Sequence, residues 1–207
     1  MSNQTQSFAD GDPGAFETLV LGIGNILWAD EGFGIRAIET LHARYTFPDS
    51  LRIMDGGTQG IFLLPWIRQA KRLLIFDAID FGLPPATIKV VRDDDVPRFM
   101  GAKKFSMHQT GFQEVLFSAQ LTGDLPPQLA LIGVQPELLD DYGGSLRDSV
   151  KSMIDPAIEL AIDILGEWNI SAKTRDRPLA DADPIGPVAL DICEYEQGRP
   201  RTLGESP

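Results

Sequence analysis

Residues 19–34 read LVLGIGNILWADEGFG: an apolar run, then glycines, then two adjacent carboxylates, Asp30 and Glu31, where a helix is expected to begin. A strand that ends in a glycine turn and leads into a helix commonly offers backbone N–H groups to a phosphate. In the dinucleotide fingerprint G-x-G-x-x-G the third glycine would stand at Leu27. The acidic pair also puts negative charge where a pyrophosphate would lie. The turn therefore has the shape of a nucleotide site and the charge of a site for a cation or for proton transfer.

The rest of the chain continues the alternation of strands and helices. Near-continuous apolar runs predict strands buried on both faces of a sheet, and apolar residues at three- and four-residue steps predict helices. The predicted strands are 18–23, 51–55, 72–79, 86–92 at an edge and 129–134, and the predicted helices are 33–47, 61–70, 112–119 and 145–168. This order predicts a three-layer α/β/α sandwich around a twisted, mostly parallel five-stranded sheet, with ligands at the carboxyl ends of the strands.

Composition divides the chain into a body and two ends. Residues 1–17 are polar and are expected to form a flexible lead. The alternating pattern fills 18–170, which is the length of one domain with one sizeable core. Beyond it the periodicity vanishes and prolines recur, so we expect 171–207 to be a disordered tail.

Charge and cysteine content exclude several classes of protein. Lys and Arg number 18 against 30 Asp and Glu, a formal charge of −12, which argues against nucleic acid or an anionic membrane as partner. The single cysteine, Cys193, excludes an intramolecular disulfide and a thiolate-rich metal site. The first residues lack a basic segment followed by an apolar one, and no run of about 18 apolar residues occurs. We expect a soluble, cytoplasmic monomer without membrane insertion.

Ionisable side chains gather at the predicted carboxyl ends of the strands. They are Asp30 and Glu31 after the first strand, Asp55 at the end of the second, Asp77 near the end of the third, and His108 just before the helix at 112. Two or three carboxylates with one imidazole can act as a metal site or as an acid and base pair.

Each of these residues also has a structural interpretation. Asp30 suits a helix N-cap, Glu31 a first turn favoured by the helix dipole, and Asp55 a turn before two glycines. His108 alone suits a loop or capping position. Asp77 is harder to assign to structure, because an ionised carboxylate in an apolar strand is costly without a partner. The residues alone thus predict an acidic cleft and name no substrate.

Five blocks of sequence, in their order and spacing, resemble the maturation endopeptidases of nickel-iron hydrogenases. They are LVLGIGNILWADEGFG at 19–34, DGGTQG at 55–60, FDAIDFG at 76–82, VRDDDVP at 91–97 and SMHQTGFQEVL at 106–116. The resemblance covers roughly residues 18–168 and leaves out the lead and the tail.

The resemblance implies a protease that removes a C-terminal extension from the precursor of the hydrogenase large subunit after nickel insertion. It also implies that Glu31, Asp77 and His108 hold a divalent metal. Two oxygen ligands and one nitrogen, without a thiolate, should bind nickel only modestly. We therefore expect nickel to be carried by the precursor and sensed by the protease. The same three residues are the catalytic candidates, with Asp55 as a fourth, in an aspartic-type or metal-assisted reaction.

Two other functions fit part of the sequence. A nickel-binding accessory protein without catalysis would use the same three residues. A nucleotide-binding oxidoreductase is suggested by Gly22-Ile23-Gly24 after a strand, and the acids that follow argue against it.

Overall fold

A five-stranded sheet forms the centre of the protein, seen in a computed structural model that describes residues 16–102, 107–176, 185 and 192–198. For 99–102, 107–110, 193, 194 and 198 only the course of the backbone is described. The strand order is β3-β1-β4-β6-β5. The four parallel strands are β1 (Thr18–Ile23), β3 (Leu51–Gly57), β4 (Arg72–Ala78) and β6 (Gln128–Val134). At the edge β5 (Ile88–Arg92) runs antiparallel to β6, which confirms the predicted sheet and its edge strand.

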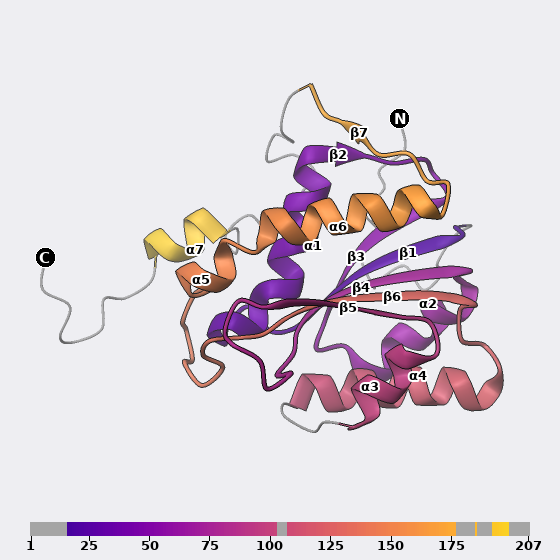
Figure 1. The fold of residues 1–207 in the computed structure, drawn as a ribbon, viewed down its shortest axis with the longest axis horizontal. Helices are drawn as coiled ribbons and strands as arrows, with labels where there is room; N and C mark the ends of the chain where they lie inside the picture. The colour runs from indigo at the N-terminus through magenta and orange to yellow at the C-terminus, as the bar shows by residue number, and fades with distance from the viewer. Residues whose placement is uncertain (1–15, 103–106, 177–184, 186–191, 199–207) are drawn as a thin grey trace, which may run out of the picture.

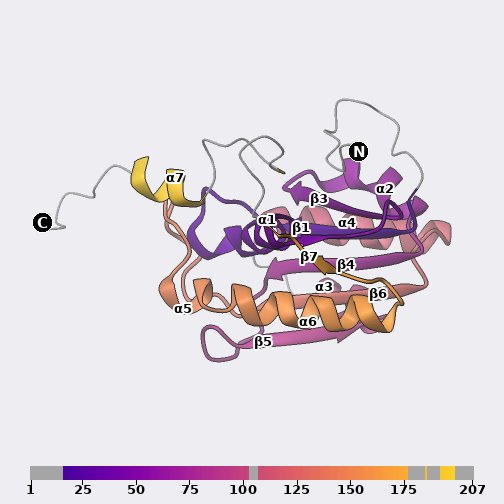
Figure 2. The ribbon, with the colours of Figure 1, turned by 90° about the horizontal axis from the view of Figure 1, so that it is seen from above.

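Helices cover both faces of this sheet, as the three-layer prediction requires (Figures 1 and 2). On one face lie α1 (Phe33–Arg44) and α6 (Ile154–Glu167), and on the other lie α2 (Leu64–Gln69), α3 (Asp95–Ala102) and α4 (Met107–Thr122). Two 3-10 turns, η2 (Ala29–Gly32) and η3 (Gly60–Leu63), follow β1 and β3. No helix in the described part of the chain is long and apolar enough to cross a membrane.

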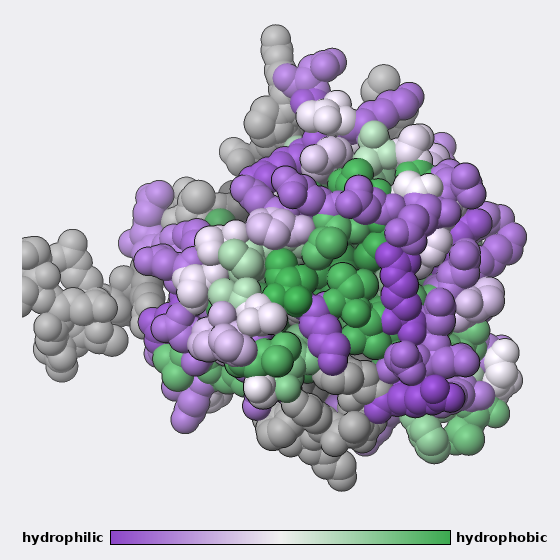
Figure 3. All heavy atoms as spheres, in the orientation of Figure 1, coloured by the Kyte–Doolittle hydropathy of each residue, from purple (hydrophilic) through white to green (hydrophobic). Residues whose placement is uncertain are grey.

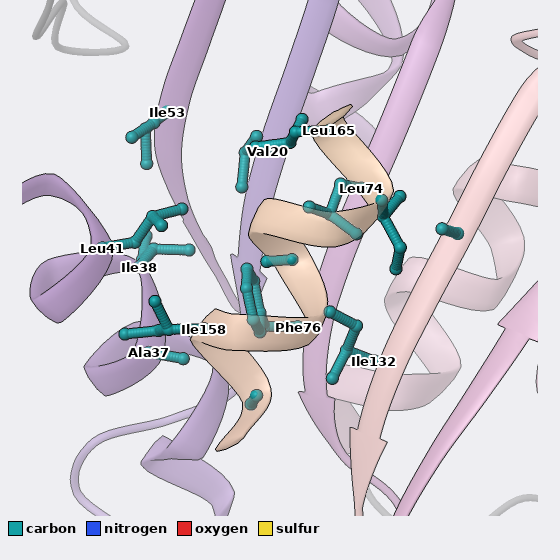
Figure 4. Packing of buried hydrophobic residues seen from close by; sticks show 14 of the residues in the cluster. Val20, Ala37, Ile38, Leu41, Ile53, Leu74, Phe76, Ile132, Ile158 and Leu165 are labelled. Carbon is teal, nitrogen blue, oxygen red and sulfur yellow. The ribbon is translucent and has the colours of Figure 1, made fainter. Parts of the chain in front are cut away.

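The sheet separates two apolar cores. Successive side chains of a strand point to opposite faces, so Phe76 of β4 packs toward α1 and α6 while Ile75 packs toward α2 and α4. Figure 4 shows Phe76 among Ala37, Ile38 and Ile158 of the two covering helices. Burial on both faces explains why β4 reads as an unbroken apolar run.

The predicted helix over 145–168 is divided in two. A short α5 (Asp148–Lys151) ends before α6 begins, and Pro156 lies in the first turn of α6. Proline has no N–H to donate to the carbonyl of Ser152, and its ring clashes with that carbonyl in a continuous helix. The chain therefore breaks at residues 152–153, and the sequence prediction of one helix was wrong.

One helix is not predicted from the sequence, and another begins earlier than predicted. α3 (Asp95–Ala102) is missed because it begins at the last of three consecutive aspartates, residues 93–95, which are typical of a loop. α4 begins at Met107 and not at Phe112, so His108 lies in its first turn. The prediction that His108 precedes the helix was wrong. The first turn of α4 contains few apolar side chains, so apolar periodicity does not reveal it.

Part of the range 171–207 belongs to the folded body. β7 (Lys173–Thr174) pairs with β2 (Tyr45–Thr46), and the Arg175 Nε–H donates to the carbonyls of His42 and Tyr45 at 3.0 and 3.1 Å. Further on, α7 (Ile192–Gly198) is held by an ion pair between Glu196 and Lys151, with N···O of 2.9 Å. The expectation of a disordered tail is too broad for these residues.

Hydrophobic surface gathers over the edge strand β5, between α6 and α3 (Figure 3). Ile88 and Val90 are partly buried there against the core. No other described strand pairs with the outer edge of β5. The exposed Lys89 in the middle of β5 puts a charge on this edge, which disfavours pairing with another strand.

Candidate functional site

The turn after β1 closes tightly on Glu31. Gly24 has φ of +141°, and a Cβ there would lie 1.8 Å from the carbonyl oxygen of Glu31. The Asn25 N–H donates to the same oxygen at 3.1 Å. Glycine is therefore required at position 24 for its backbone conformation and for lack of space for a side chain. Its absence of a side chain lets the backbone of Glu31 in η2 pack against the residue that follows β1.

A second close approach joins this turn to β4. A Cβ on Gly34 would lie 2.3 Å from the carbonyl oxygens of both Ile23 and Phe76. The start of α1 thus rests on the ends of β1 and β4 with no side chain between them. Glu31 lies three residues before this contact and Asp77 one residue after it, so the two predicted acids come from adjoining points of the backbone.

Asp77 is completely buried in β4. By the strand alternation its side chain shares a face with Leu73 and Ile75, whose core lies under α2 and α4. An ionised carboxylate in such a place is stable only where hydrogen bonds or opposite charge offset its desolvation. The Asp77 carboxylate therefore needs such compensation on the α4 side of the sheet.

The first turns of α4 lie at the same edge of the sheet. Gly60 begins η3, just beyond the end of β3, and a Cβ on Gly60 would lie 3.8 Å from the Cα of Gly111. His108 is three residues before Gly111, about one helical turn. The backbone of His108 is thus near the carboxyl ends of the strands, while its side chain lies outside the described part.

Asp55 is also at this edge but on the other face. Its backbone partner in β1 is Gly22, which also pairs with Phe76. In register, paired residues of neighbouring strands point to the same side, so Asp55 faces the α1 layer while Asp77, next to Phe76, faces the α4 layer. The predicted gathering of the acids at one sheet edge is observed, but the sheet separates these two carboxylates.

Burial raises the pKa of the Asp55 carboxyl above its ordinary value. The Gly57 N–H and the positive charge of Arg36 oppose this shift without cancelling it. Arg36 is itself buried on α1, where it forms an ion pair with Glu39 at 2.9 Å. Asp55 thus has an environment that favours its protonated form more than water does.

Asp30 has a role that the sequence does not indicate. It is fully buried and makes no capping bond to η2, so the predicted N-cap was wrong. Its Oδ2 accepts the N–H groups of Glu137 and Leu138 at 2.9 and 2.8 Å, and its Oδ1 accepts the Arg147 N–H at 2.7 Å. Asp30 thereby ties the turn after β1 to the loop after β6. These partners are 107 to 117 residues away in the chain, so no local pattern could reveal them.

The N–H groups that a nucleotide phosphate would need are used within the protein. Leu27 donates to the Asn25 side chain at 3.0 Å, and others donate to backbone carbonyls. The donors of this second kind are Gly24, Asn25, Trp28, Asp30 and Glu31. The glycines of this turn serve close packing of α1 on the sheet, which removes the basis for the oxidoreductase alternative.

The described side chains include no group of three or more His, Cys, Asp or Glu arranged to hold a metal. The predicted set of Glu31, Asp77 and His108 lies partly outside that search, because the His108 side chain is not described. Its chemistry fits a divalent ion: two carboxylates and one imidazole suit nickel or zinc without selecting strongly between them. The metal set therefore stays a prediction.

A mostly parallel sheet with carboxylates at its carboxyl edge, among them the fully buried Asp30 and Asp77, suits an α/β protein that hydrolyses a bond or handles a metal. The comparisons with known proteins narrow this class. The model of the family described as "Hydrogenase maturation protease" matches residues 35–164. The chain belongs to the hydrogenase maturation protease family and is a peptidase, which confirms the resemblance stated from the five sequence blocks.

Relatives of known sequence and structure agree with this assignment. The hydrogenase expression/formation protein HoxM of Azotobacter vinelandii is 56% identical over 182 residues, which are 88% of this chain and 86% of HoxM. The hydrogenase 2 maturation protease of Escherichia coli is 42% identical over 159 residues, 76% of this chain and 96% of its own length. The solved hydrogenase maturating endopeptidase HybD of E. coli has a TM-score of 0.73 and 40% identity over 77% of this chain and 98% of its own.

Proposed function

We propose that this protein is the endopeptidase that removes the C-terminal extension from the precursor of a nickel-iron hydrogenase large subunit, after nickel has been inserted. Family membership supports a maturation protease. The observation that carries the proposal is the contact of Gly34 with Phe76, which brings the turn of Glu31 against the strand of Asp77. Hydrolysis of a peptide bond needs acid and base groups close to one another, as neighbouring segments that carry Glu31 and Asp77 can supply.

We propose further that Glu31, Asp77 and His108 bind nickel that the precursor carries. Oxygen and nitrogen ligands without a thiolate favour an affinity low enough for the ion to leave with the product. Complete burial of Asp77 supports a preference for a positive ion beside it. In this proposal nickel is part of the substrate, and the protease recognises a loaded precursor by binding that nickel.

Two chemical routes are compatible with this arrangement. In the first, one carboxylate of Glu31 and Asp77 takes a proton from water as the oxygen attacks the scissile carbonyl, and a protonated group gives a proton to the leaving amine. In the second, nickel in the substrate polarises the carbonyl and the same carboxylates orient the water. Asp55 is a weaker candidate than its place at the sheet edge suggests, since it faces the opposite layer from Asp77.

The test is incubation of the purified protein with nickel-loaded and nickel-free precursor, followed by mass spectrometry of the products. We expect the loss of one C-terminal peptide from the loaded precursor alone. Equal cleavage of both forms would contradict nickel sensing. Cleavage of neither form, with binding retained, would favour the accessory-protein alternative.

The ligand set has its own test. Asp77→Asn and His108→Ala are compared with Asp163→Asn, an exposed acid of α6. We expect both site variants to lose cleavage by at least about a hundredfold, the range of a lost acid, base or metal ligand, and the control to keep it. Calorimetry on the isolated protein should find nickel binding no tighter than micromolar, and a nanomolar resident ion would contradict the sensing proposal. We also propose that the protein works as a monomer in the cytoplasm.

A further inference from the structure

Two loops beside Glu31 form one surface that the catalytic proposal does not use. The turn after β1 (24–30) and the loop between β6 and α5 (136–147) are called the loop platform here. In Figures 1 and 2 the orange loop before α5 lies beside the purple start of α1, at the end of the sheet where the parallel strands finish. The platform therefore borders the proposed catalytic edge.

Hydrogen bonds and a β-bridge hold the two loops of the platform together. Asp30 accepts three backbone N–H groups of the second loop, and its own N–H donates to the Leu138 carbonyl at 3.2 Å. The Gly143 N–H donates to the Leu27 carbonyl at 2.7 Å, and Trp28 and Tyr142 form an antiparallel bridge. A buried carboxylate that accepts three charge-assisted hydrogen bonds strongly fixes the relative position of the two loops.

The outer side of the platform is apolar. Tyr142 is 70% exposed, and Leu27 and Leu138 are each 37% exposed. The Tyr142 ring stands edge-on to Trp28 with centroids 5.2 Å apart, so it is held in place while exposed. A fixed, exposed aromatic side chain among smaller apolar ones is the kind of anchor that carries binding energy at protein interfaces.

The exposed charges of the second loop are acidic. Glu137, Asp140 and Asp148 are exposed on or next to the second loop. Its one basic residue, Arg147, is paired with Asp141 at 2.8 Å. The charge at the rim is therefore negative, and a complementary partner would present Lys or Arg beside apolar residues.

We propose that the loop platform is the docking surface for a basic, partly apolar segment of the hydrogenase precursor, with Tyr142 as its anchor. This rests on the proposed function, which makes the precursor the protein brought to Glu31. The platform holds the precursor next to the catalytic edge without contacting the scissile bond. Its residues act on affinity and leave the chemical step unchanged.

The experiment measures steady-state cleavage of nickel-loaded precursor by Tyr142→Ala and by the matched control Phe117→Ala. Phe117 is an exposed aromatic residue of α4, 60% accessible, away from the first turn of that helix. We expect Tyr142→Ala to raise KM about tenfold at unchanged kcat, and Phe117→Ala to match the wild type, since truncating an interface anchor costs on the order of a tenfold change in affinity. Equal KM for both variants would overturn the proposal.

A second variant removes the risk that Tyr142→Ala disturbs the fold. Asp140→Lys reverses a charge on an exposed side chain and should also raise KM, whereas Asp163→Lys, exposed on α6, should not. If the wild type binds the precursor without cutting it, the proposed function fails. The same four variants then decide the docking surface by titrated precursor pull-down, where equal binding by all of them contradicts it.

Discussion

Asp30 and Glu31 are neighbours in sequence with opposite assignments. Glu31 is partly exposed at the site, while Asp30 is fully buried and holds the loop after β6 through three hydrogen bonds. Hydrogen bonds to a charged group are each worth about 1.5–3 kcal/mol, and they are lost together if the acceptor changes. The acid that resembles a surface helix cap is therefore a central link of the molecule.

Replacing Asp30 by Asn should destabilise the fold by about 3 kcal/mol, since the neutral amide accepts weakly and its NH₂ group faces donors. Urea unfolding followed by tryptophan fluorescence measures the loss. Asp140→Asn, on the exposed part of the same loop, should change stability by no more than about 0.5 kcal/mol. Similar midpoints for the two variants would show that the three bonds to Asp30 carry little free energy.

Asp55 predicts a dependence of stability on pH. Its pKa is higher in the folded protein than in the unfolded chain, mainly because of burial. A carboxyl group with a raised folded pKa costs no stability while it is protonated in both states. The cost appears as pH rises above the unfolded value and is complete above the folded one.

Asp55→Asn should therefore be more stable than the wild type at pH 7, and this advantage should shrink as the pH falls toward 4. Urea midpoints at both pH values measure it, with the exposed Asp49→Asn as control. An advantage that grows toward pH 4 would contradict the assigned direction of the shift.

Among the elements, the strands and α1 could be predicted, while the loops around the site could not. β1 was predicted with its bounds, and β4 within one residue, because parallel strands buried on both faces have a local apolar signature. The early start of α4 and the whole of α3 lack such a signature. The separation of Asp55 from Asp77 depends on register between strands, which one strand's sequence does not contain.

The short segment around β7 gives a prediction for the limits of the domain. Arg175 donates to the carbonyls of His42 and Tyr45 at the end of α1, where the helix leaves acceptors unpaired. Arg175→Ala should destabilise the protein by about 1–2 kcal/mol through those lost bonds. Lys173→Ala, exposed in the same segment, should be near neutral in the same thermal or urea melt. Equal stabilities of the two variants would contradict a stabilising role for residues 171–176.

For the whole molecule, the excess of acid acts on partners more than on the fold. A net charge of −12 should attract a basic segment of the precursor over several ångströms. The Debye length falls from about 10 Å at 0.1 M salt to about 3 Å at 1 M. We expect KM for the precursor to rise several-fold between these salt concentrations while kcat changes little. The rise should be smaller for Asp140→Lys, and a KM indifferent to salt would contradict charge-guided docking.

The three hydrogen bonds that Asp30 accepts also affect hydrogen exchange in the loop after β6. An amide in a loop normally exchanges its hydrogen with solvent through small local fluctuations. The Glu137, Leu138 and Arg147 amides instead donate to a carboxylate that is itself inside the protein. Their hydrogens can exchange only when the loop after β6 separates from the turn after β1, which breaks these bonds to Asp30. In deuterium exchange these three loop amides should therefore be protected as strongly as those of the central strands.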